Sequence, residues 1–202
     1  MIKTLIFDFG DVFVNLDKPA TLRRLKDLNI DGFTPDTVEK NLELETGRIS
    51  SEEFLNHYLE EYPQLDKEKA VEAWNAVLVD LPEYRYRFIK KLAEQGKYRL
   101  ILLSNTNAIH IDWVKKNVPF FDDFRKCFDA FYLSHEINFR KPNVDIYNYV
   151  LEKHHLIAAE CLFIDDTEEN IEGAKKAGLR TWKLEPTHED VIDLFTTKKE
   201  LF

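Results

Sequence analysis

Acidic residues follow two of the apolar runs in this 202-residue chain, at the point where each run ends. Asp8 comes directly after residues 5–7, and Asp165 and Asp166 come directly after residues 162–164. A buried strand cannot hold an unpaired charge at low cost, so we expect these carboxylates just past the strand ends. In an open parallel sheet, ligands bind at that edge. Carboxylates gathered there repel one another, which favours a cation beside them.

Three further polar groups occupy similar positions. Ser104 and Asn105 follow the apolar run 100–103, and Lys141 precedes Pro142 at the start of a predicted helix. Taken singly, these residues are explained as an ordinary cap and a solvated lysine. Taken together, they all fall at strand ends or in the adjoining loops. Oxygen ligands without histidine or cysteine favour Mg²⁺, which also pairs with phosphate. The six histidines lack the spacing of a zinc site.

The elements that must position these groups alternate along the chain. The predicted strands are residues 5–7, 100–103, 130–133, 162–164 and 180–184. Helical patterns separate the later strands, and a final helix is predicted over 190–195. This order predicts an α/β fold, namely a doubly wound, Rossmann-like parallel sheet.

A long helical block separates the first two strands. Ser50 and Glu53 have the spacing of a capping box, and Val71, Trp74 and Leu78 share one face of a predicted helix. We therefore predict a small all-helical cap inserted after strand 1, above the carboxyl ends of the strands. The predicted domains are an α/β core of residues 1–15 and 81–202 and a cap of residues 16–80.

Composition excludes several classes of function. The net charge of −9 and the absence of a basic run argue against nucleic acid and anionic membranes as partners. No apolar stretch approaches the length of a membrane span, and Met1 leads straight into a strand rather than a signal peptide. Cys127 and Cys161 lack metal-ligand spacing, which is typical of a reduced pair in a cytoplasmic protein. The sequence leaves both a monomer and a homodimer open.

Four short motifs resemble those of the haloacid dehalogenase superfamily, whose members are mostly phosphatases. They are Phe7-Asp8-Phe9-Gly10, Leu103-Ser104-Asn105, Lys141-Pro142 and Phe163-Ile164-Asp165-Asp166. The longer runs 103–107, 140–142 and 165–174 are similar to a small-cap subgroup. That subgroup includes glucose-1-phosphate phosphatase and the phosphatase domain of soluble epoxide hydrolase. The resemblance covers the whole chain and implies a hydrolase that acts on a small phosphorylated molecule.

The resemblance also implies a metal and a nucleophile. Asp8 would attack phosphorus and form an aspartyl phosphate. Mg²⁺ would bind the Asp8 carboxylate, the Gly10 carbonyl and Asp166, with Asp165 close by or acting through water.

The remaining implied roles concern the substrate. Ser104, Asn105 and Lys141 would bind the phosphoryl oxygens, and Lys141 would also offset the repulsion between carboxylates. The turn at Gly47 and Arg48 is a candidate specificity contact, with an ordinary solvated arginine as the alternative.

One position departs from the superfamily pattern. Most of its phosphatases carry a general acid two residues after the nucleophile, where this chain has Gly10. Asp11 comes next, but along an extended chain it would point the other way. The glucose-1-phosphate phosphatase subgroup also has glycine there, so the change is compatible with activity. Without that acid the leaving oxygen must be acidic by itself, which favours an anomeric ester.

The predicted function is therefore a Mg²⁺-dependent phosphomonoesterase for a sugar phosphate such as a sugar 1-phosphate. Two alternatives stay open: a 2-haloacid dehalogenase and a non-catalytic phosphate-binding protein that has lost its general acid. The pair of Asp165 and Asp166 argues against the dehalogenase, because that chemistry needs no metal. A receiver domain also gathers carboxylates and a lysine, but the helical insertion disfavours it.

Overall fold

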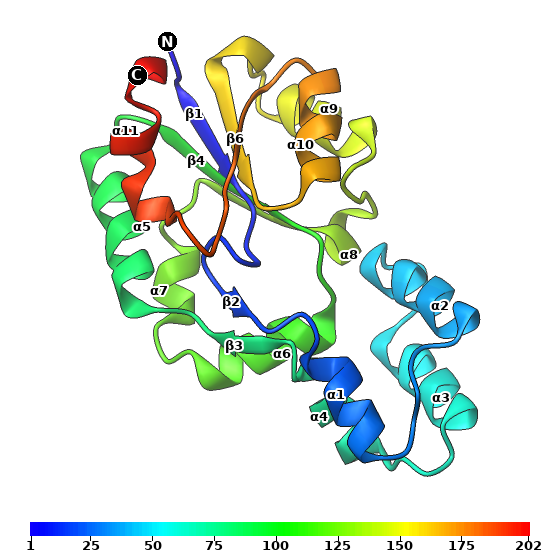
Figure 1. The fold of residues 1–202 in the computed structure, drawn as a ribbon. Coiled ribbons are helices and arrows are strands. Elements are labelled where there is room, and N and C mark those ends of the chain that lie inside the picture. Colours follow the sequence, from blue (N-terminus) through cyan, green and yellow to red (C-terminus); the bar gives the residue numbers. More distant parts are fainter.

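The computed structural model describes residues 1–202 and contains a five-stranded parallel sheet with the order β5-β4-β1-β6-β7 (Figure 1). The strands are β1 (Thr4–Phe7), β4 (Arg99–Ser104), β5 (Ala130–Leu133), β6 (Cys161–Asp165) and β7 (Arg180–Lys183). Successive strands extend the sheet to one side of β1 and then to the other. This reversal opens a crevice at the carboxyl end of β1, between β4 and β6. The predicted doubly wound α/β fold is confirmed.

Helices cover both faces of the sheet, and alternate strand residues point to opposite faces. Leu5 and Phe7 of β1 belong to the same buried cluster as side chains of α5, α6, α7 and α11. Ile6 belongs to the cluster of α9 and α10 on the other face (Figure 1). The helices are α5 (Glu83–Gln95), α6 (Ala108–Asn117), α7 (Phe121–Arg125), α9 (Val144–Lys153), α10 (Glu168–Lys176) and α11 (Leu194–Thr197). Burial on both faces explains why the strands are apolar throughout.

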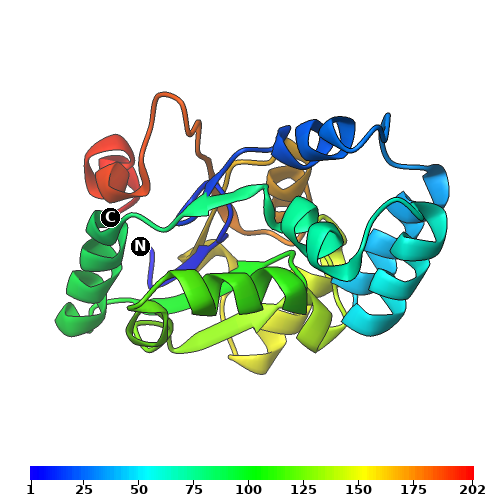
Figure 2. The same cartoon turned by 90° about the horizontal axis from the view of Figure 1, so that it is seen from below.

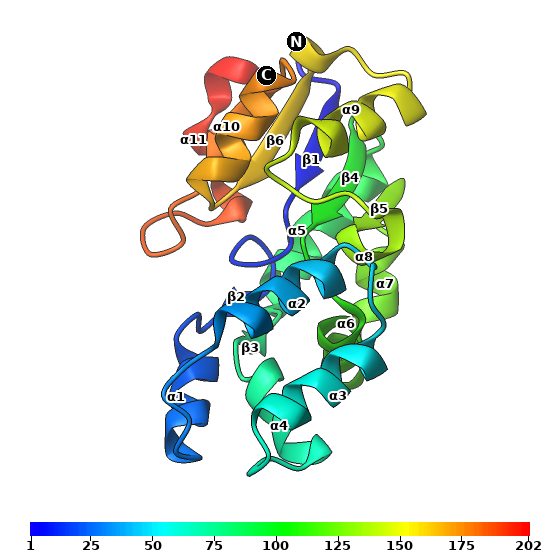
Figure 3. The same ribbon diagram turned by 90° about the vertical axis from the view of Figure 1, so that its right-hand side faces the viewer.

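Four helices lie between β1 and α5 in the chain and have a buried core of their own. They are α1 (Ala20–Asp27), α2 (Pro35–Glu45), α3 (Ser51–Glu61) and α4 (Lys67–Asn75). Their core includes Phe54, Tyr58 and Trp74. The predicted capping box at the start of α3 is present, with Ser50 and Glu53 each accepting a backbone N–H of the other. Figure 3 shows these helices beyond the carboxyl ends of the sheet strands.

A small antiparallel pair joins the helical insertion to the sheet domain, and the sequence prediction missed it. It pairs β2 (Asn15–Leu16) with β3 (Leu78–Asp80). Leu78 was predicted on a helix face with Trp74, but α4 ends at Asn75 and Leu78 begins β3. The prediction was wrong because the partner strand lies about sixty residues earlier, outside any local pattern. Viewed from below, β3 lies between the helices of the insertion and α5 (Figure 2).

The remaining elements are short. They are α8 (Ser134–Ile137) and three 3₁₀ turns, Ala158–Glu160, Val191–Asp193 and Lys199–Leu201. The helix predicted over 190–195 is therefore a 3₁₀ turn that leads into α11. None of the helices combines the length and the apolar character that a membrane crossing requires.

Candidate active site

A pocket of about 410 Å³ opens at the carboxyl end of β1 and is lined mainly by polar and charged residues. Four loops from distant parts of the sequence contribute to it. Asp8 and Gly10 follow β1, Asn105 follows β4, Lys141 precedes α9, and Asp166 follows β6. The structure thus brings five of the seven predicted site residues into one pocket, because parallel strands place their carboxyl ends at one edge.

Lys141 is buried between two carboxylates. Its Nζ lies 2.7 Å from Asp8 Oδ1 and 2.7 Å from Asp165 Oδ2. Burial raises the pKa of Asp8 to about 7, with Lys141 acting in the opposite direction and Asp165 in the same direction. Burial acts to lower the pKa of Lys141, but the charges of Asp165 and Asp8 outweigh it and leave that pKa above its ordinary value. Loss of one partner would leave an uncompensated buried charge.

Asp165 and Asp166 differ in how many of their oxygens are engaged. Asp165 is fully buried and accepts hydrogen bonds from Lys141 Nζ, the Thr167 backbone N–H and the Asn170 side chain, at 2.7–3.1 Å. Asp166 accepts a long hydrogen bond from Thr167 Oγ1 and pairs with Lys18. Asp165 therefore positions Lys141 and the start of α10, while Asp166 presents its carboxylate to the pocket.

The acidic cluster fits a hard divalent cation. Asp8, Asp165 and Asp166 each offer an oxygen, and these oxygens lie within 4.8 Å of one another. No histidine or cysteine belongs to the cluster, and such an oxygen set suits Mg²⁺. Because Asp165 is saturated by hydrogen bonds, Asp8 and Asp166 are the two carboxylates that would hold the metal directly.

The predicted phosphate-binding residues occupy different places. The Asn105 amide clamps the backbone of Lys141: its Nδ2 donates to Lys141 O (2.9 Å) and its Oδ1 accepts from Lys141 N (3.0 Å). Ser104 is buried, does not line the pocket, and has only a 3.4 Å hydrogen bond from its Oγ to Asn105 O. Asn170, which also lines the pocket, was not among the predicted ligands.

The loop after Gly10 turns away from the extended path that the sequence suggested. Asp11 has a left-handed φ of 53°, its Oδ1 accepts from the Leu16 backbone N–H, and its Oδ2 pairs with Lys18 at 2.9 Å. A Cβ at Gly10 would lie 2.8 Å from Leu16 Cδ1, so Leu16 fills the space that a side chain would need.

Lys18 contributes a second cation that sequence reasoning missed, since a lysine in a loop carries no signal of its own. Its Nζ lies 2.6 Å from Asp166 Oδ2, and the side chain lines the pocket. Partial burial acts to lower the pKa of Lys18, but hydrogen bonds to Asp166 and Asp11 outweigh it and hold that pKa above its ordinary value. The side chain is therefore an ammonium.

A close approach of α10 supports the Lys141 loop from behind. A Cβ at Gly173 would lie 2.2 Å from Pro142 O and 3.0 Å from the ring of Tyr147. Tyr147 in turn donates its hydroxyl to Asn170 O at 2.7 Å. Only glycine lets the helix backbone reach this carbonyl, so Gly173 helps to set the position of Lys141.

The helical insertion contacts the sheet domain beside Lys141. Glu45 at the end of α2 pairs with Arg140 Nε at 2.6 Å, and Arg140 Nη1 donates to Lys141 O at 3.0 Å. Gly47 packs so tightly that a Cβ would lie 2.2 Å from the carbonyl of His135. Arg48, the candidate specificity residue, is exposed and does not line the pocket.

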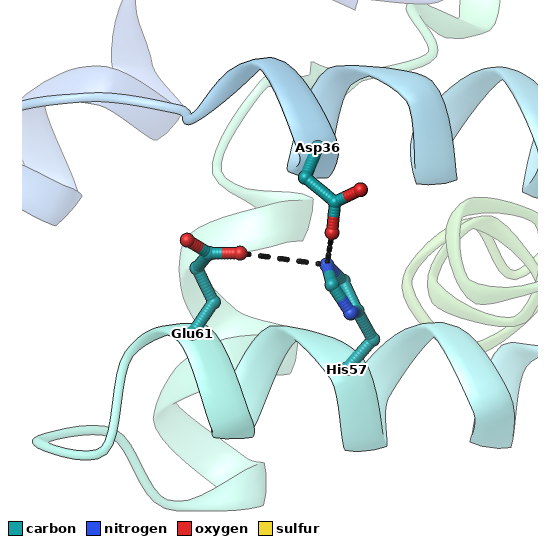
Figure 4. A group of neighbouring side chains, drawn as sticks. All are labelled: Asp36, His57 and Glu61. Atoms are coloured by element: carbon teal, nitrogen blue, oxygen red, sulfur yellow. Dashed lines mark ion pairs between the residues drawn. The ribbon is translucent and has the colours of Figure 1, made fainter.

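A second group of possible metal ligands lies within the helical insertion (Figure 4). His57 Nε2 lies 2.9 Å from Asp36 Oδ2 and 3.6 Å from Glu61 Oε2. Asp36 is on α2, while the other two residues are on α3. The contacts link the two helices, and Asp36 is mostly exposed, so an ordinary ion pair accounts for this cluster.

Comparison with known proteins identifies the class of hydrolase to which this fold and this acidic site belong. Residues 2–178 match the haloacid dehalogenase-like hydrolase family, and the chain belongs to that family. It is similar to D-ribitol-5-phosphate phosphatase of Bacteroides thetaiotaomicron, with 29% identity over 92% of this chain and 93% of the relative. The predicted superfamily and hydrolase class are confirmed.

Solved relatives hold the predicted metal. A haloacid dehalogenase family enzyme of Bacteroides thetaiotaomicron, solved as a magnesium complex, has a TM-score of 0.86 and 34% identity. The match covers 96% of this chain and 98% of that one. The same enzyme, solved with magnesium and inorganic phosphate, has a TM-score of 0.84 and 33% identity, covering 96% of this chain and 100% of that chain. The cofactor predicted from the sequence is thus the metal bound by these relatives.

Proposed function

We propose that this protein is a Mg²⁺-dependent phosphomonoesterase that works through an aspartyl phosphate on Asp8. The observation that carries the proposal is the buried contact of Asp8 with Lys141, next to Asp166 in a polar pocket. Lys141 orients the Asp8 carboxylate and offsets its negative charge. Water is largely excluded around both groups. A carboxylate held in this way can attack phosphorus without competing solvent.

The chain's other groups would bind and orient the transferred phosphoryl group. Asp8, the Gly10 carbonyl and Asp166 would hold Mg²⁺, with Asp165 acting through Lys141 or water. The metal would shield the nucleophile from the negative charge of the phosphate. Of the predicted phosphate-binding residues, Asn105 and Lys141 line the pocket and would stabilise the phosphoryl oxygens, whereas Ser104 does not line it.

We propose a phosphorylated sugar or sugar alcohol as substrate. A pocket of about 410 Å³ lined mainly by polar and charged residues suits a small hydroxylated molecule. The relative named for D-ribitol 5-phosphate supports a sugar alcohol ester. The glycine at position 10 instead supports a sugar 1-phosphate, whose leaving oxygen is more acidic. A panel that contains both kinds of ester separates the two.

We also propose that residues 16–80 act as a cap over an α/β core made of residues 1–15 and 81–202. The pairing of β2 with β3 supports this division, because it brings the two ends of the insertion together. The ion pair between Glu45 and Arg140 would hold the cap in place beside Lys141. A closed cap excludes water from the pocket.

The test is turnover of an aryl phosphate with and without Mg²⁺. The parent should release phosphate with Mg²⁺ and stop in excess chelator. Asp8→Asn should lose nearly all turnover, while the control Asp112→Asn, at an exposed pair with Lys115, should keep it. Metal-independent release of chloride from a 2-chloro acid would favour the dehalogenase alternative. Phosphate binding without turnover would favour the non-catalytic alternative.

A further inference from the structure

Lys18 connects two carboxylates at the mouth of the pocket. Its Nζ lies 2.6 Å from Asp166 and 2.9 Å from Asp11. The lysine side chain is 60% exposed, whereas the Asp166 and Asp11 side chains are 8% and 14% exposed. The ammonium therefore lies on the solvent side of both carboxylates and shields them from water.

The two carboxylates that Lys18 contacts have different roles. Asp166 is one of the two carboxylates that would hold the metal directly, so an ammonium at 2.6 Å takes up its charge. Asp11 is held in place by the Leu16 backbone N–H and lies outside the metal cluster. Lys18 belongs to the loop between β2 and α1, so its long side chain can leave one partner and keep the other.

We propose that Lys18 exchanges partners when the metal is loaded: it gives up Asp166, keeps Asp11, and presents its ammonium to the organic part of the substrate. This proposal rests on the proposed phosphatase function. It makes Lys18 a substrate-binding residue whose availability depends on the metal. Two cations that share one carboxylate repel each other, so Lys18 also weakens metal binding.

Burial indicates which part of the substrate Lys18 meets. Lys141, which is proposed to bind the phosphoryl oxygens, and the nucleophile Asp8 are both buried. Lys18 is largely exposed, so the part of a substrate that extends from the phosphoryl group toward solvent passes it. An ammonium offers three hydrogen-bond donors and no acceptor. It therefore suits the hydroxyl oxygens of a sugar or sugar alcohol.

The first experiment measures metal affinity without substrate, with Mn²⁺ as the probe, by electron paramagnetic resonance or calorimetry. Lys18→Met should bind Mn²⁺ about two- to fivefold more tightly than the parent, the size expected for one exposed ion pair. Lys18→Arg should return the affinity toward that of the parent. The control Lys126→Met removes the same charge at an exposed pair with Asp123 and should leave the affinity unchanged. Unchanged or weaker binding in Lys18→Met overturns the proposal.

The second experiment separates the organic part of the substrate from the phosphoryl group. Lys18→Met should raise KM for ribitol 5-phosphate by about fivefold, as the loss of one hydrogen bond predicts. Inhibition by inorganic phosphate should stay as in the parent. An equal shift of both constants would assign Lys18 to the phosphoryl site and overturn the proposal. A parent that turns over neither ribitol 5-phosphate nor an aryl phosphate would refute the phosphatase function instead, and the Mn²⁺ measurement would still decide the exchange at Asp166.

Discussion

The missing carboxylic acid at Gly10 has a measurable consequence for the choice of leaving group. General acid help is typically worth about two to four powers of ten in rate. Without it, the acidity of the leaving oxygen must carry more of the barrier, so the parent should prefer aryl and anomeric phosphates. A primary alkyl phosphate should be turned over about 10²-fold more slowly or worse.

An acid restored at position 10 would meet the Leu16 side chain. A Cβ at position 10 would lie 2.8 Å from Leu16 Cδ1, closer than real Cβ contacts allow. Gly10→Asp alone must therefore push Leu16 aside, while Gly10→Asp with Leu16→Ala has the room. Leu16 is partly buried against the main core, so Leu16→Ala should lower the free energy of unfolding by about 1–2 kcal/mol.

The assay is a series of phosphate monoesters with graded leaving-group acidity, run on the parent, on Leu16→Ala and on the double variant. The parent and Leu16→Ala should show a steep dependence of kcat/KM on that acidity. The double variant should gain about tenfold or more on the least acidic leaving group and little on aryl phosphates. Urea denaturation of each protein checks that the fold is kept.

A flat dependence in the parent would refute this reasoning, because it would mean that another acid already protonates the leaving oxygen. Asp11 would be the first residue to test in that case. Its carboxylate is engaged by the Leu16 backbone N–H and by Lys18. Asp11→Asn keeps an oxygen for the backbone contact, so a loss of rate confined to poor leaving groups would identify Asp11 as the acid.

Three further predictions follow from the site and its supports. Asp166→Ala should abolish tight metal binding with the fold intact. Asp165→Ala should also lower the free energy of unfolding by about 3 kcal/mol or more, since it removes one of the two carboxylate partners of the buried Lys141 ammonium. Equal stability of the two variants in urea would contradict this. Burial lowers the pKa of His110 to about 4. As the pH falls below about 6.5, this histidine takes up a proton in the unfolded chain before it does so in the folded chain. The stability that the neutral, buried imidazole contributes is therefore complete above that pH and is lost toward pH 4. Between pH 7.5 and 5 the loss should be up to about 2 kcal/mol in urea denaturation, and His110→Gln should remove it; an unchanged pH dependence would contradict the assignment. Gly173→Ala should push α10 from the Pro142 carbonyl, lower stability by about 1–3 kcal/mol and reduce kcat; turnover equal to the parent's would show that the loop tolerates the shift.

Local patterns were sufficient for the five strands of the parallel sheet and for much of the site. Each apolar run is short and ends at a polar residue, so the end of the strand can be read without knowing its neighbours. Parallel pairing then brings those ends to one edge whatever the details of the loops. For this reason Asp8, Asn105, Lys141 and Asp166 could be predicted to lie together, and the structure places all four in one pocket.

Pairings over long separations needed the tertiary structure. Asn15 and Asp80 are 65 residues apart and meet only through the strand pair β2 and β3, so Leu78 read as part of a helix. Helical and strand patterns of three residues are indistinguishable until a partner strand is known. The close approach of Gly173 to Pro142 could not be predicted for the same reason, because neither segment carries a sequence signal for contact with the other.

The family resemblance singled out Asp166 as the direct metal ligand, but the contacts that distinguish the charged groups came from the structure alone. Adjacent carboxylates at 165 and 166 look alike in the sequence, yet one is saturated by hydrogen bonds and the other faces the pocket. Lys18 lies 148 residues from Asp166 and still forms an ion pair with it. Residue type determines which charges a chain carries. Which of them become partners depends on burial and on distances that only the folded chain defines.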